Sequence, residues 1–158
     1  MEAWSDFFVA EAGAAAALAG LLFVAVSINL PRVLAIPHLP TRAIESLTAL
    51  VSVLFVATCG LIPEQTLAAY GWEIGGVGVV ALTIQTVSFA NTSHVSRQHG
   101  RLVAHLIMNQ APPLPFVIAG GLMIFGYDVG AYWIAPGVLL SFLSGILGAW
   151  VLLVEIQR

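Results

Sequence analysis

The residues most able to do chemistry lie in a proline-rich segment in the second half of the chain. Residues 105–115 read His-Leu-Ile-Met-Asn-Gln-Ala-Pro-Pro-Leu-Pro. A proline has no N–H, so these prolines leave carbonyls four residues earlier without their usual helical donors: those of Met108, Asn109 and Ala111. Freed carbonyls and amide side chains at the midplane of a bilayer are how many transporters bind ions. The segment predicts a path for a small cation or solute, with His105, Asn109 and Gln110 beside the carbonyls.

Two polar stripes on other helices extend this prediction. Gln85 and Ser88 follow a run of glycines at steps of three or four, so they share one helical face. A second stripe holds Ser52 together with Glu45, Thr48 and Cys59. These stripes could line a wet cavity beside the broken helix, or they could satisfy one another in a dry core. A proline kink that only shapes packing, with Asn and Gln as interhelical hydrogen-bond partners, is the simpler alternative.

The acidic residues suggest a mouth for such a path. Glu11 and Glu73 are expected near the outer surface, where carboxylates concentrate cations at a pore entrance. Both carboxylates could instead be interfacial and solvated. Glu45 is expected near the start of a helix, where a carboxylate favours the helix dipole and can pair with Arg42 three residues earlier.

No enzyme, metal or cofactor signature accompanies these residues. His94, His99 and His105 are separated by five and six residues, with no cysteine or acid among them, which matches no familiar zinc pattern. The chain has no Gly-x-Ser-x-Gly, His-Glu-x-x-His or phosphate-loop motif. With one cysteine, it cannot form an internal disulfide. We therefore expect no enzyme, no metal and no cofactor.

Composition places these residues in a bilayer. Of the 158 residues, 59% are hydrophobic and 8% are charged, against about 25% charged in a typical soluble domain. This excludes a soluble enzyme, a nucleic-acid binder and a disordered chain. About 20 apolar residues cross the hydrocarbon core. Five stretches qualify, so we predict an all-α bundle of five transmembrane helices forming a single membrane domain over 1–158: 7–29, 43–62, 66–90, 102–125 and 131–154.

The arginines predict the orientation of this bundle, because arginine is retained on the cytoplasmic side. A five-span topology puts all five on one side: Arg32, Arg42, Arg97, Arg101 and Arg158. The N-terminus is then outside and the C-terminus cytoplasmic. Arginine without lysine and alanine-rich helices are typical of GC-rich bacterial genomes, so we expect a multi-pass protein of the bacterial cytoplasmic (inner) membrane.

Small residues predict how the helices meet. Lipid gives helices no hydrophobic drive to associate, so small residues spaced four apart supply the contact by letting backbones approach. Three helices carry such stripes, which include Gly13 and Gly20, Gly75 and Gly78, and Gly145 and Gly148. The stripes fit a tight single-chain bundle. At least one of them could instead face another subunit, so we expect a homo-oligomer surrounded by membrane lipid.

The leading functional prediction is a cation-permeable path, in a channel or transporter, around the broken fourth helix. Its ion or solute path comprises His105, Met108, Asn109, Gln110, Ala111, Gln85, Ser88 and Ser52, below an outer acidic mouth of Glu11 and Glu73. The alternative is a non-transporting membrane protein that binds and regulates a partner membrane protein. The small-residue stripes and the lack of any complete ion site favour that alternative.

Overall fold

The protein is all-α. The computed structural model describes residues 4–93 and 110–157, and no strand occurs within these ranges. The described elements follow one another as six α-helices and one 3-10 helix: α1 (Ser5–Ile28), α2 (Leu30–Ala35), α3 (Leu39–Gly60), α4 (Leu67–Ser93), α6 (Pro113–Ile124), η2 (Asp128–Trp133) and α7 (Ile134–Gln157). The predicted all-α helical bundle is confirmed.

Four segments in the described ranges are long and apolar enough to cross a membrane: Ser5–Ile28, Leu39–Gly60, Leu67–Ser88 and Asp128–Glu155. They make the protein a small, multi-pass integral membrane protein. The predicted fourth span, 102–125, is described only from residue 110 onward. Its α6 has 12 residues and rises about 18 Å, short of the roughly 30 Å hydrocarbon core. The five-span count and the orientation therefore stay predictions.

Prolines set the helix starts, and here the structure corrects the predicted loop between the first two spans. Pro31 and Pro40 do not lie in irregular chain but in the first turns of α2 and α3. An N–H in the first turn of a helix has no intrahelical acceptor, so a proline there removes no helical hydrogen bond. The second span accordingly begins at Leu39 rather than at residue 43.

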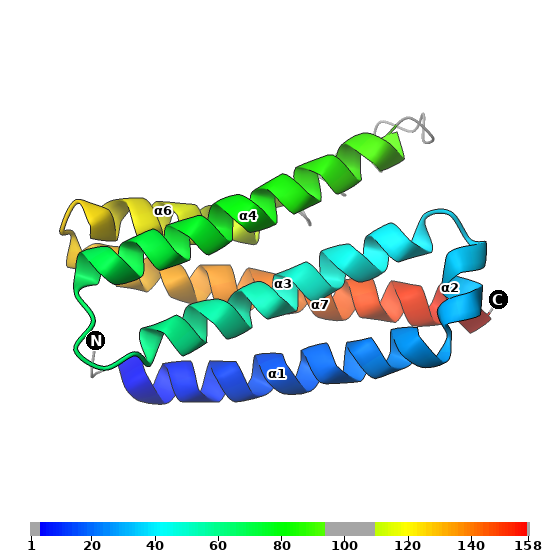
Figure 1. Cartoon of the computed structure of the whole chain (residues 1–158), viewed down its shortest axis with the longest axis horizontal. Coiled ribbons are helices and arrows are strands. Elements are labelled where there is room, and N and C mark those ends of the chain that lie inside the picture. Colours follow the sequence, from blue (N-terminus) through cyan, green and yellow to red (C-terminus); the bar gives the residue numbers. More distant parts are fainter. Residues whose placement is uncertain (1–3, 94–109, 158) are drawn as a thin grey trace.

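The helices form two groups (Figure 1). Helices α1, α3 and α7 lie along one another, with α1 and α7 running in the same direction and α3 in the opposite one. Helix α6 lies antiparallel against α4. Helix α4 packs on α3 near its own start and diverges from α3 toward its carboxyl end.

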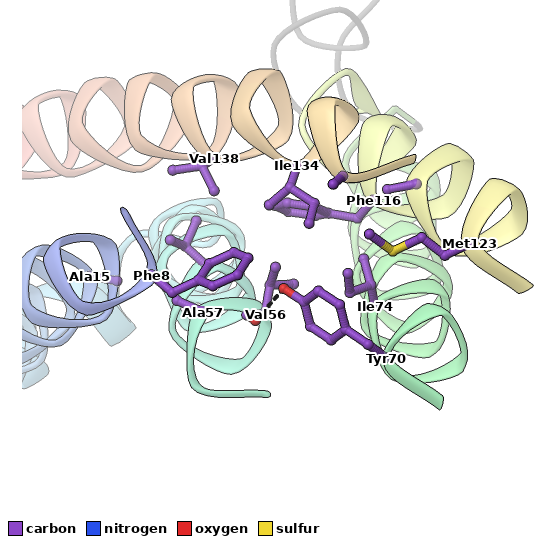
Figure 2. Packing of buried hydrophobic residues seen from close by; sticks show 13 residues of the cluster. Phe8, Ala15, Val56, Ala57, Tyr70, Ile74, Phe116, Met123, Ile134 and Val138 are labelled. Atoms are coloured by element: carbon purple, nitrogen blue, oxygen red, sulfur yellow. Dashed lines mark hydrogen bonds between the residues drawn. The ribbon is translucent and has the colours of Figure 1, made fainter. Parts of the chain in front are cut away.

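The main core joins the two groups at the end where α1 and α4 begin (Figure 2). Phe8, Tyr70, Ile74, Phe116 and Ile134 come from the four helices α1, α4, α6 and α7, and each is at most 1% exposed. The Tyr70 hydroxyl donates a hydrogen bond to the backbone carbonyl of Val56 at 3.0 Å, which ties α4 to α3. This region is dry and apolar across the full width of the bundle.

The glycine stripe of α4 packs inside the chain. A Cβ added at Gly120 of α6 would lie 2.6 Å from the carbonyl oxygen of Gly71 and from Cα of Gly75. A Cβ at Gly78 would lie 2.9 Å from the backbone nitrogen of Val117. Gly75 and Gly78 of α4 thus lie directly against the backbone of α6.

The stripe of α7 also faces inward, whereas that of α1 does not. A Cβ at Gly145 would lie 2.8 Å from Leu50, and one at Gly148 would collide with the hydroxyl of Ser46 on α3. Around Gly13 and Gly20 no atom of the described chain lies within 4 Å of such a Cβ. These two glycines lie on the face of α1 opposite to the one that contacts α3, so their packing role stays a prediction.

Candidate functional site

The predicted helix break lies directly before α6. The chain is helical at Gln110, forms a turn over Ala111 and Pro112, and enters α6 at Pro113. Pro115 has no N–H to donate to the carbonyl of Ala111, as the sequence indicated. Helix α6 therefore begins within the proline-rich segment, at Pro113. The other predicted path residues of this segment, His105, Met108 and Asn109, lie outside the described residues.

Gln110 bridges this break to α4. Its side-chain amide donates a hydrogen bond to the hydroxyl of Thr86 at 3.2 Å. That hydroxyl donates in turn to the carbonyl of Leu82 at 2.7 Å. The amide nitrogen of Gln110 thus forms an interhelical hydrogen bond, which is the simpler of the two roles considered for this residue.

Gln85 is the most unusual polar residue of the described chain. Its side chain is 1% exposed, and its amide oxygen Oε1 is buried with no hydrogen-bond partner among the described residues. The contacts of Gly71 with Ile124 and of Gly78 with Val117 fix the antiparallel register of α4 and α6. Continued along α4, this register puts Gln85 level with residue 110, so the orphaned oxygen lies at the depth of the helix break. A buried acceptor left unpaired costs about 1–3 kcal/mol, so its presence needs a reason.

The positions of the other described path residues give weaker support for a binding site. Ser52 is buried on α3, but its hydroxyl donates to the carbonyl of Thr48 in its own helix at 2.7 Å. Ser88 is half-buried on α4, one turn beyond Gln85, and has a bonding partner. Ala111 is half-buried. Of the described candidates, Gln85, Gln110 and Ala111 are the ones that share a level at the break.

Three buried polar residues were not among the predicted path residues: Glu45, Ser46 and Ser141. Ser141 on α7 is 1% exposed and lies one turn after Gly137, where an added Cβ would meet the ring of Phe116. Ser141 therefore lies near the start of α6. Glu45 on α3 is only 6% exposed, whereas the sequence suggested a carboxylate near a helix end. An ionisable residue buried in a spanning helix is a functional candidate by default.

The two predicted mouth residues are both half-buried at the end where α1 and α4 begin. The Glu73 carboxylate accepts a hydrogen bond of 2.6 Å from the side-chain amide of Gln65, and the thiol of Cys59 lies beside it. Glu11 lies on α1, and no interaction between Glu11 and Glu73 is seen in the described parts of the chain. The two acids therefore do not form a joint site there.

An apolar barrier separates this acidic end from Gln85. Phe116 of α6 is fully buried in the apolar core with Ile74, and the register of α4 and α6 places it between the levels of Glu73 and Gln85 (Figure 2). A hydrated ion cannot pass such a dry cluster without rearrangement. In this conformation the described chain holds no open path from Glu73 to Gln85.

The polar atoms near the break are neutral oxygens. An amide oxygen and a freed backbone carbonyl are hard ligands, suited to alkali and alkaline-earth cations rather than to soft transition metals. Within residues 4–93 and 110–157, no three His, Cys, Asp or Glu side chains gather as a metal centre would require. The neutral oxygens near the break are thus of the type that hard cations prefer.

Comparison with known protein families, with curated proteins and with solved structures finds no match to the chain. Its function must be argued from its own residues.

Proposed function

We propose that the protein carries a small monovalent cation across the membrane, binding it between α4 and the helix break before α6. The observation that carries this proposal is the amide oxygen of Gln85, which is fully buried and unpartnered at the level of the break. A bound cation would satisfy this oxygen together with the carbonyl of Ala111. Oxygen ligands at a broken helix are the arrangement by which many transporters hold Na⁺ or a proton.

A carrier fits the described chain better than an open channel. The apolar core around Phe116 closes the bundle between Gln85 and the acidic end. A carrier needs such a closed side, because its site must open to one face of the membrane at a time.

The test is cation uptake into liposomes that contain the purified protein, measured with radioactive Na⁺ and Rb⁺ beside empty liposomes. Gln85→Met keeps the length of the side chain but removes the oxygen. Loss of one ligand worth about 1.5–3 kcal/mol should reduce uptake roughly tenfold to a hundredfold. Thr83→Val is the matched control, because Thr83 is an exposed polar residue of the same helix, bonded only to its own turn.

The stability of the same variants makes this experiment decisive. If Gln85→Met keeps the fold and loses uptake while Thr83→Val retains it, the proposal stands. Uptake that equals that of empty liposomes for both ions and both directions overturns it. Uptake that Gln85→Met leaves unchanged also overturns it.

A second candidate function, binding of a partner membrane protein, is favoured by α1. Only Phe8, Ala15, Ala19 and Leu22 of its 24 residues are buried. Its outward face carries the small residues Gly13, Ala16, Ala17 and Gly20. Such a face lets another helix approach closely. Cross-linking in native membranes, compared between the natural chain and Gly20→Leu, tests this candidate.

A further inference from the structure

A narrow apolar groove runs between α1 and α7. It encloses about 240 Å³ and is lined only by apolar residue types, with Leu50 of α3 and Gly145 of α7 at its floor. Its walls include Leu18 and Ala25 from α1, and Ala149 and Leu153 from α7. The span from Leu18 to Ala25 corresponds to about 10 Å along the helix axis.

The groove exists because α1 and α7 both pack on α3 and have little contact with each other. Leu50 packs with Ala19 and Leu22 of α1, and it fills the space that a side chain at Gly145 would need. Small residues at Ala25 and Ala149 then leave the space between the two outer helices unfilled. The two helices run in the same direction in Figure 1, so the groove has one end toward α2 and one toward the middle of the bundle.

A cation lies beside the α2 end of the groove. Val33 of α2 is buried in a cluster with Leu152 of α7, against which Val26 of α1 packs, so α2 is held at the point where the groove ends. Arg32 precedes Val33 and is exposed. A guanidinium is permanently charged and has five N–H donors, so one arginine can bind more than one acceptor. Trp150, which is 67% exposed at the groove edge, adds an amphipathic ring of the kind that settles near headgroups.

We propose that the groove is a site for an anionic phospholipid, with one acyl chain between α1 and α7 and the phosphate on Arg32. The chain would come from the leaflet on the α2 side. Small-molecule sites usually enclose about 300–1,000 Å³, so a groove of 240 Å³ suits a single linear chain better than a compact ligand. A second helix, about 10–12 Å across, is too wide to enter it.

The headgroup decides whether a lipid stays. An acyl chain in the surrounding bilayer is already in an apolar environment, so the chain alone gives little preference for the groove over the bilayer. Filling the groove recovers the dispersion contacts that its lining would otherwise lack. Arginine binds phosphate through paired N–H donors, and one arginine near an anionic lipid surface contributes about a fivefold gain in affinity. The structure thus combines a shape for the chain with a charge for the head.

The test is native mass spectrometry of the purified full chain in detergent, with phosphatidylglycerol or phosphatidylcholine added. We expect one retained phosphatidylglycerol per chain and about fivefold less phosphatidylcholine. Ala25→Leu fills the groove and should abolish this retention. Ala14→Leu is its control, because Ala14 lies on the same helix, is exposed, and is absent from the groove lining. Arg32→Gln should remove the preference between the two lipids, and Arg32→Lys should keep part of it.

Each alternative result identifies what is wrong. Equal retention of both lipids by the natural chain overturns the role of Arg32. Equal retention by Ala25→Leu and Ala14→Leu overturns the groove as the site. If Ala25→Leu instead converts an oligomer to a monomer without changing lipid retention, a second copy occupies this face and the lipid proposal fails. Thermal unfolding of each variant ensures that a loss of lipid is not a loss of fold.

Discussion

The crossing of α4 and α6 gives the sharpest prediction, because two adjacent glycines of α6 have opposite surroundings. A Cβ at Gly120 would lie 2.6 Å from backbone atoms of Gly71 and Gly75. Ordinary van der Waals contact begins near 3.4 Å, and backbone cannot rotate away as a side chain can. A Cβ at Gly121 has no atom of the described chain within 4 Å.

Gly120→Ala must therefore separate the two helices. Overpacking of this kind costs about 1–3 kcal/mol, and the gain in helix propensity from glycine to alanine returns about 0.5–1 kcal/mol. We expect Gly120→Ala to lower the free energy of unfolding by about 1–2 kcal/mol. Gly121→Ala has the same propensity gain without the clash, so it should be neutral or slightly stabilising.

The measurement is thermal unfolding of both variants and the natural chain in one detergent, followed by circular dichroism. In a chain of this size, each kcal/mol corresponds to about 2–4 °C in Tm. The two variants should therefore differ by several degrees, with Gly120→Ala the lower. Equal Tm values for the two variants would refute the close backbone contact between α4 and α6.

The other helices give further expectations. Gly145→Leu should destabilise the fold by about 1–3 kcal/mol, because its side chain would displace Leu50, and the Tm of the monomer checks this. Gly20→Leu should leave that Tm unchanged within about 0.5 kcal/mol, since the surrounding space is open, but should abolish cross-linked dimers if another copy packs on α1. Tyr70→Phe should cost about 0.5–1.5 kcal/mol in unfolding free energy, because it removes the hydrogen bond to Val56, and an unchanged unfolding midpoint would contradict that bond.

Much of the fold could be predicted from the sequence, because its local signals are strong. Long apolar runs set the helices α1, α3, α4 and α7. Gly126 lies between the predicted spans 102–125 and 131–154, and its backbone φ of 82° shows why glycine stands there. Its N–H bonds the carbonyl of Met123, and that of Tyr127 bonds Leu122, which is the usual way to end a helix on glycine.

Which element each small-residue stripe contacts could not be predicted, because the spacing of residues along one helix does not identify the neighbouring helix. Gly78 and Gly145 lie on inward faces, whereas Gly20 lies on an outward face, yet all three belong to similar patterns. The direction depends on which face each helix buries, and that is decided by tertiary packing. The same reason applies to Glu45. The sequence places it near a helix start, where it favours the helix dipole or pairs with Arg42, but only the packing shows that its side chain is buried.

The candidate site, too, could be predicted only in part from the sequence. The helix break before α6 follows from proline chemistry alone, and the placement of Gln85 on the glycine face of α4 follows from helical spacing. The hydrogen bond from Gln110 to Thr86 and the unpaired oxygen of Gln85 could not be predicted, because both depend on the register between two helices. This register is set by Gly71, Gly78 and their partners on α6, which no local pattern specifies.

These contacts also determine what could move in a carrier. Helices α4 and α6 touch through backbone at Gly75 and Gly120, so they can shift only as one rigid body. That body is tied to α3 at one end, where Tyr70 bonds Val56, and is already separated from α3 at the other (Figure 1). Rotation about the tied end would widen or narrow the space beside Gln85 while leaving the apolar core intact. Opening the acidic side instead would require the core around Tyr70 and Phe116 to separate. Alternating access to Gln85 would thus require two different motions: a hinge on the α2 side and a core rearrangement on the other.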